Sequence, residues 1–137
     1  MATSTEAYAP EGSIIQTFEA GGTISQFDIV TLHTAAGEVV AASTEATGFG
    51  IAAHDAVDGD TIAVCTFGPF KVRVGEAFAS IAGAPPFFTN DTSSEAHLAV
   101  DQQPCVGYLT VNSRTGDAYA DQDLADCFVN YQTYSAA

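Results

Sequence analysis

The apolar residues of this chain stand in short runs that glycine, aspartate and proline interrupt every few positions. The run at residues 14–18 ends before Gly21 and Gly22, and the run at residues 29–32 is followed by a gap of hairpin length that contains Gly37. Runs of this length suit β-strands, and they are too short for helices with an apolar stripe. The chain is therefore expected to consist of strands and turns.

The composition and the alternation of side chains agree with this expectation. Eleven Val and seven Ile stand against four Leu, and β-branched residues fit pleated strands better than helices. In the clearest alternation Phe70, Val72 and Val74 share one face while Lys71 and Arg73 share the opposite, outward face. We therefore predict an all-β fold.

With 137 residues and a mass of 14.1 kDa, the chain has the length of one domain. Residues 1–13 are small and polar, without a period that could bury a face, and we interpret them as an extended N-terminal arm that becomes ordered on a partner. Residues 14–137 are expected to form one domain, in which residues 77–81 fit a strand or one helical turn and residues 121–125 are the one candidate for a short helix. A similar order of apolar strands and polar loops occurs at 29–64 and again at 87–129, which predicts two related β-motifs packed into one barrel or sandwich.

The charge narrows the classes of partner. Three basic residues face seventeen acidic ones, which gives a net charge of -14 and argues against binding to nucleic acid or to an anionic membrane. The sequence begins without a basic segment followed by an apolar one, and no long apolar run follows, so we expect a soluble protein made without a signal peptide.

The cysteines and histidines indicate no cofactor or metal. Cys65, Cys105 and Cys127 are unpaired in the sequence and have apolar neighbours, as expected of buried reduced thiols in a cytosolic protein. A zinc site needs histidine partners at ligand spacing, and the three histidines stand far apart. We therefore predict no cofactor.

Some polar residues could carry chemistry, and each also has a structural interpretation. His54 beside Asp55 could be a polarised base, or a pair at an exposed strand end. Two groups of acidic residues could each bind calcium through their carboxylate oxygens, although no bidentate Glu follows at the spacing of an EF-hand. The alternative is that they are solvated turn acids or a helix cap. The groups are Asp55, Asp58 and Asp60, and Asp121, Asp123 and Asp126.

Aromatic residues could form a sugar-binding platform, because amphipathic rings stack on sugars and keep a polar tip. The candidates are Tyr108, Tyr119, Tyr131 and Tyr134. Core and interface packing is the other use of these rings. No nucleophile motif of the G-x-S-x-G type and no phosphate-binding glycine loop is present, so we predict that the chain is not an enzyme and has no catalytic residues.

Taken together, the glycine and valine positions resemble those of the tailed-phage capsid cement proteins, also called head decoration proteins, a family long described as a domain of unknown function. The resemblance covers the first half of the chain and continues more loosely through residues 106–109 and 127–129. Its residues are Gly12-Ser13-Ile14-Ile15, Phe18, Ala20-Gly21-Gly22-Thr23-Ile24, Asp28-Ile29-Val30, Gly37-Glu38-Val39-Val40-Ala41-Ala42, Gly50-Ile51-Ala52, Gly59-Asp60-Thr61-Ile62-Ala63-Val64 and Gly68-Pro69-Phe70.

The resemblance implies a small β-barrel or β-tulip-like domain that forms a homotrimer on the outer surface of a phage head. It would be made in the host cytoplasm and would clamp neighbouring major capsid protein subunits. The N-terminal arm would contact the capsid, and the candidate contact residues are Thr3, Thr5, Glu6, Tyr8 and Pro10. We expect Lys71 and Arg73 either to contact carboxylates of another subunit or of the capsid, or only to cover apolar surface. The alternative function is a β-sandwich module on a virion that binds carbohydrate or a host surface.

Overall fold

The computed structural model describes residues 7–32, 37–42, 48–78, 86–90, 93–98, 104–110 and 118–133. In this part of the chain every regular element is a strand, which confirms the predicted all-β class. No helix among the described residues is long and apolar enough to cross a membrane. The nine strands are β1 (Ile14–Ala20), β2 (Ile29–Leu32), β3 (Glu38–Ala41), β4 (Gly50–Ala52), β5 (Thr61–Arg73), β6 (Pro86–Asn90), β7 (Ser93–Leu98), β8 (Pro104–Leu109) and β9 (Leu124–Thr133).

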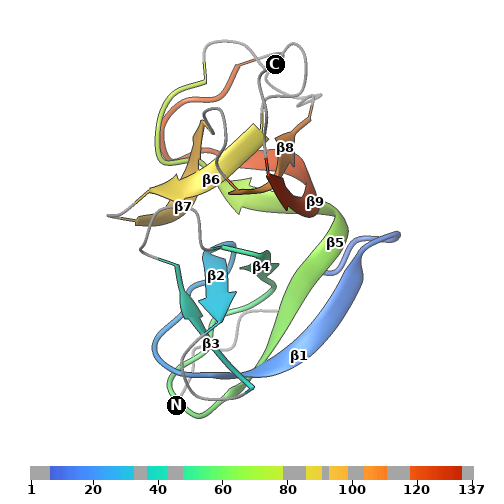
Figure 1. The fold of residues 1–137 in the computed structure, drawn as a ribbon, viewed down its shortest axis with the longest axis vertical. Coiled ribbons are helices and arrows are strands. Elements are labelled where there is room, and N and C mark those ends of the chain that lie inside the picture. The colour runs from blue at the N-terminus through green and yellow to red at the C-terminus, as the bar shows by residue number, and fades with distance from the viewer. Residues whose placement is uncertain are drawn as a thin grey trace.

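The strands form two closed rings that share β5 (Figure 1). The first ring runs β1-β3-β2-β4-β5 and closes because β5 also pairs with β1. The second ring runs β5-β9-β8-β6-β7 and closes through a parallel bridge between Val74, just after β5, and Ala96 of β7. In Figure 1 the first ring lies below the second, and β5 rises from one into the other.

Strand β5 is continuous through Phe67, Gly68 and Pro69, where the alternation in the sequence is interrupted. Its first half pairs with β1 as far as Phe67, and its second half pairs with β9 from Gly68 onward. Gly68 has a φ of 107°, and a Cβ there would lie 2.6 Å from the carbonyl oxygen of Gly12. Only glycine fits at this point, where the strand passes from the first ring to the second.

The two rings repeat each other in register. In the first ring β1 and β3 make a parallel contact at Ala20 and Val39, and in the second ring Val74 and Ala96 make the same contact. Ile51 of β4 lies opposite Cys65, just as Tyr108 of β8 lies opposite Phe128. The structure therefore confirms the internal repeat between residues 29–64 and 87–129, and it shows that each copy closes its own ring.

Matching turns precede β5 and β9. Asp60 accepts a hydrogen bond from the Val57 N–H at 3.0 Å, and Asp123 accepts one from the Ala120 N–H at 2.8 Å. The residues before them, Gly59 and Gln122, both have a positive φ. The helix predicted at 121–125 was wrong, because the Asp123 carboxylate bonds the backbone of a turn and β9 begins at Leu124.

The apolar core is divided in the same way. One buried cluster fills the first ring, and its members are Ala20, Ile24, Val30, Val39, Ala52, Ala56, Ile62 and Val64. The other cluster combines the interior of the second ring with Ile29, Ile51 and Cys65 from the first ring. The second ring thus packs against one outer face of the first, and a shared core joins the two repeats.

Candidate functional site

The described part of the N-terminal arm lies on the domain. The Tyr8 N–H donates a hydrogen bond to the Ala53 carbonyl at 2.9 Å, and the Tyr8 ring contacts Phe27 and Phe70 with centroid distances of 5.5 and 5.0 Å. Burial raises the pKa of the Tyr8 phenol, while nearby Lys71 acts in the opposite direction. A single aromatic residue therefore docks a segment whose remaining residues are small or polar.

Of the other arm candidates, Pro10 is half-buried and its carbonyl accepts hydrogen bonds from the Ser13 N–H at 3.1 Å and the Ser13 hydroxyl at 2.6 Å. These bonds close a turn that leads into β1. Thr3, Thr5 and Glu6 lie outside the described residues.

Lys71 and Arg73 project from the outer face of the second ring, as their alternation predicts, but Lys71 has a partner in its own chain. Its ammonium nitrogen lies 2.9 Å from Oδ1 of Asp126, the residue opposite it on β9.

The charge of Arg73 acts on the Asp28 carboxyl, which precedes β2. Burial raises the pKa of this carboxyl, whereas the Ser25 N–H, the Ser94 side chain and the charge of Arg73 lower it.

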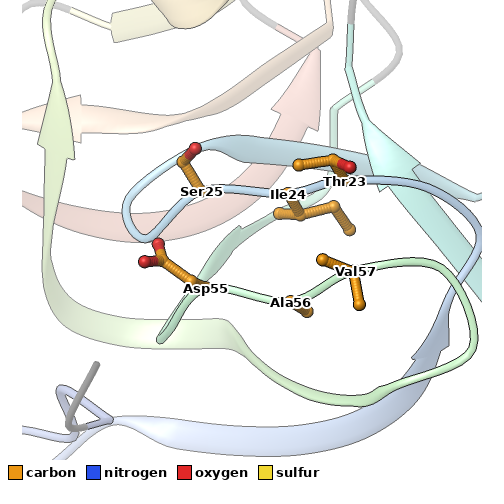
Figure 2. Close-up of a pocket in the computed structure, with 6 residues that line it drawn as sticks. All are labelled: Thr23, Ile24, Ser25, Asp55, Ala56 and Val57. Carbon is orange, nitrogen blue, oxygen red and sulfur yellow. The ribbon is translucent and has the colours of Figure 1, made fainter. Parts of the chain in front are cut away.

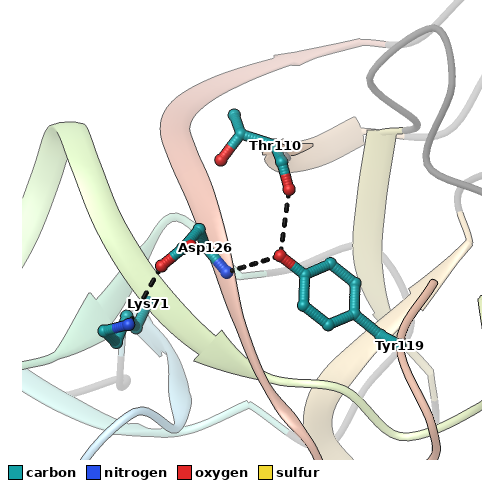
Figure 3. A network of polar contacts seen from close by, with 4 residues as sticks. All are labelled: Lys71, Thr110, Tyr119 and Asp126. Atoms are coloured by element: carbon teal, nitrogen blue, oxygen red, sulfur yellow. Dashed lines mark hydrogen bonds and ion pairs between the residues drawn. The ribbon is translucent and has the colours of Figure 1, made fainter. Parts of the chain in front are cut away.

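Asp126 belongs to a network that joins β5, β9 and the end of β8 (Figure 3). The Asp126 N–H donates to the Tyr119 hydroxyl at 3.0 Å, and that hydroxyl donates to the Thr110 carbonyl at 2.9 Å. Tyr119 is only 2% exposed, and burial raises the pKa of its phenol while the bond to Asp126 lowers it. Tyr119 therefore has a structural role and cannot be part of a sugar platform.

His54 is also held by the backbone. Its Nε2 accepts a hydrogen bond from the Ala63 N–H at 3.0 Å, so its Nδ1 carries the proton and donates to the Asp55 carbonyl at 2.8 Å. The Asp55 carboxylate accepts instead from the Gln26 N–H at 2.7 Å. This geometry gives no polarised base, and it makes His54 and Asp55 a structural pair that is half-buried and not exposed as expected of a strand end.

The two acidic groups do not converge. Asp60 and Asp123 bond the backbones of their own turns, Asp126 pairs with Lys71, and the side chains of Asp58 and Asp121 are exposed. Among the residues that the structure describes, no three side chains of the metal-binding types gather. Asp58 and Asp121 fit the solvated-turn interpretation, whereas Asp60 and Asp123 bond their turns, Asp126 is ion-paired on a strand, and each group leads into a strand and not into a helix that it could cap.

A small depression lies where the loop before β2 bridges the loop before β5 (Figure 2). Its volume is about 140 Å³, and its lining residues are Thr23, Ile24, Ser25, Asp55, Ala56 and Val57. Pockets for drug-sized ligands usually have volumes of about 300 Å³ or more. This depression is too small for such a ligand.

The three thiols are buried and free of disulfides, as predicted. Burial raises the pKa of Cys65 to about 11, although its bond to the Phe67 carbonyl lowers it slightly. Burial also raises the pKa of Cys127. Such thiols are poor nucleophiles because the reactive thiolate is rare at neutral pH.

An aromatic face lies on the outside of the strands β1, β5, β9 and β8, and of its members only Tyr108 was a candidate from the sequence. We define the aromatic face as Ile14, Phe67, Tyr108 and Phe128. Ile14 is 53% exposed and Phe67 is 43% exposed. The Phe128 ring contacts that of Phe67 edge to face at 5.2 Å and stacks on that of Tyr108 at 5.5 Å. Of the other predicted platform residues, Tyr131 is exposed and Tyr134 lies outside the described residues.

A comparison with solved structures finds a similar chain, the gp8.5 N base of the head fiber of bacteriophage phi29. The TM-score is 0.65, and the match covers 90% of this chain and 98% of that chain. The two chains share a fold. Because their sequence identity is 13%, the match establishes a fold shared with this phage head-fiber protein and does not by itself assign a common role. No protein-family model matches the chain, and no curated protein sequence matches it.

Proposed function

We propose that this chain is a capsid decoration protein, or cement protein, that binds the outer surface of a phage head as a homotrimer and stabilises contacts between major capsid subunits. The observation that carries the proposal is the fold shared with a head-fiber base over 90% of this chain and 98% of that one. The proposal places the protein on the virion and assigns it no catalysis.

The charge and the cysteines support this role. An acidic protein with a net charge of -14 gains nothing from contact with packaged DNA, and its charge keeps the free protein dispersed before assembly. Three buried thiols without disulfides suit a protein made in a reducing host cytoplasm.

We place the capsid contacts in the N-terminal arm and at the half-buried cations Lys71 and Arg73 of the second ring. Tyr8 fixes the arm to the domain, so Thr3, Thr5 and Glu6 are the arm residues proposed to reach the shell. Lys71 is neutralised by Asp126, and Arg73 is therefore the better candidate for a contact with a capsid carboxylate.

The test uses heads of the phage that encodes the chain, prepared without it. We expect the purified protein to co-sediment with these heads and to raise the temperature at which they dissociate. A variant without residues 2–6 is the matched comparison, and it should bind more weakly while unfolding at the same temperature as the full chain. Absence of binding by the full chain at micromolar concentration would refute the proposal.

A further inference from the structure

The internal repeat shows that equivalent faces of the two rings differ in burial. In the first ring Ile51 and Cys65 lie opposite each other, and both are 0% exposed because the second ring covers them. The equivalent pair in the second ring is Tyr108 and Phe128, and both residues remain partly exposed. Within the described part of the chain, the contact between the rings thus covers the face of the first ring more completely than the corresponding face of the second ring.

The contact inside the chain shows what kind of surface covers such a face. Ile29 of the first ring and Val106 of the second meet over Gly48, where an added Cβ would clash with Ile29 and approach Val106 to 3.2 Å. By register, Val106 corresponds to Phe49 of the first ring. Phe49 is half-buried beside Phe18, with ring centroids 5.7 Å apart, so the first ring offers a comparable apolar end.

The aromatic face is already organised for binding. Phe67 and Tyr108 both contact the Phe128 ring, so covering them would cost little side-chain entropy. Beside the face, the charges of Lys71 and Asp126 cancel. In a chain with a net charge of -14, an apolar face bordered by a neutral pair is a place where two copies can meet with little repulsion.

We propose that a second copy of this chain covers the aromatic face, and that the Phe18 and Phe49 end of its first ring provides the contact. This inference rests on the homotrimer of the proposed function and assigns its interface. The two surfaces differ, so the contact is heterologous, and three copies form the proposed trimer if the rotation that repeats the contact closes a ring.

The experiment compares single charge substitutions by analytical ultracentrifugation. Phe67→Lys and Phe49→Lys place a charge on the two sides of the proposed contact, and Leu32→Lys is the control because Leu32 is 65% exposed and lies on β2. We expect the first two substitutions to weaken association about 30-fold or more, the loss typical of an interface hot spot. Leu32→Lys should leave the association unchanged.

Circular dichroism verifies that each variant keeps its strands, and if Phe49→Lys does not fold, Phe67→Lys still decides, because Phe67 is 43% exposed and lies outside the buried core. A wild-type protein that stays monomeric, or a Phe67→Lys variant that associates normally, overturns the inference. A third outcome also overturns the inference: if the wild-type protein is a monomer that binds glycan, and Phe67→Lys no longer binds it, the aromatic face is a sugar site. Head binding is measured separately, so a monomer that still binds heads refutes this interface but not the capsid role.

Discussion

At the scale of single residues, the backbone decides what the polar side chains do. His54 stands next to Asp55 in the sequence, which suggests an acid-base pair, but both ring nitrogens of His54 bond main-chain groups. The Ala63 N–H that His54 satisfies lies across the turn, nine residues along the chain. Sequence neighbours could not reveal that partner, because it depends on how Ala63 pairs in β5.

We predict that His54→Ala destabilises the protein by about 1–2 kcal/mol, because the Ala63 N–H loses its acceptor. Urea unfolding followed by circular dichroism measures the change. Thr61→Ala, at an exposed position near the start of β5, is the control and should change the stability by less than about 0.5 kcal/mol. Equal effects of the two substitutions would contradict the structural role of His54.

Cys65 makes the stability depend on alkaline pH. Its pKa is raised from 9.0 to about 11 by burial, so above pH 9 the unfolded chain loses this proton before the folded chain does. The contribution of the protonated Cys65 thiol to the free energy of unfolding is therefore fully present below about pH 9 and is lost as the pH rises through about 11. The free energy of unfolding, measured between pH 8 and pH 10.5, should fall as the pH rises.

In Cys65→Ala the same fall should be smaller, because one of the titrating groups is gone. Part of it should persist, since burial also raises the pKa values of Cys127 and Tyr119. If both proteins lose stability equally over this range, Cys65 does not contribute to the pH dependence.

At the scale of elements, the short apolar runs between turn residues located several of the strands, and the period of two located the outward and inward faces of β5, because both signals are local. Residues 29–32 were predicted as a strand and form β2. The continuity of β5 through Gly68 was not foreseen, because Phe67, Gly68 and Pro69 have the composition of a turn. The φ of 107° that keeps this strand in both rings is imposed by the approach of Gly12.

We predict that Gly68→Ala destabilises the protein by about 2–3 kcal/mol, because alanine disfavours a positive φ and its Cβ would lie 2.6 Å from the Gly12 oxygen. Gly22→Ala is the matched control, since a Cβ there meets nothing within 4 Å. Chemical denaturation should show a lower midpoint for the first variant only. A Gly68→Ala protein with the stability of wild type would show that the crossing of β5 tolerates a side chain.

At the scale of the whole molecule, the sequence foresaw the class of fold and the internal repeat but not the surface that the repeat leaves uncovered. Lys71 and Arg73 were placed on an outward face correctly, because alternation within one strand decides it. The aromatic face combines Ile14, Phe67, Tyr108 and Phe128 from four strands. Their proximity depends on the pairing of β5 with both β1 and β9, which no local pattern encodes.

The N-terminal segment gives a prediction at this scale. Tyr8→Ala should lower the stability by about 1–3 kcal/mol, because Phe27 and Phe70 lose an aromatic partner. This expectation departs from that of a free arm over residues 1–13, whose removal would leave the domain unaffected. Thermal unfolding of Tyr8→Ala beside the variant without residues 2–6 distinguishes the two cases. If the melting temperature is unchanged in both variants, residues 1–13 form a free arm that does not stabilise the domain.

The shared strand β5 also determines how the molecule responds to force. Two repeats joined by a linker can swing relative to each other, whereas these two are joined by hydrogen-bonded strand on both sides of Gly68. A bend between the rings must break pairs of β5 with β1 or with β9, or be taken up at Thr66, where the register of β1 against β5 shifts. A load applied to one ring is therefore carried to the other mainly through paired strand.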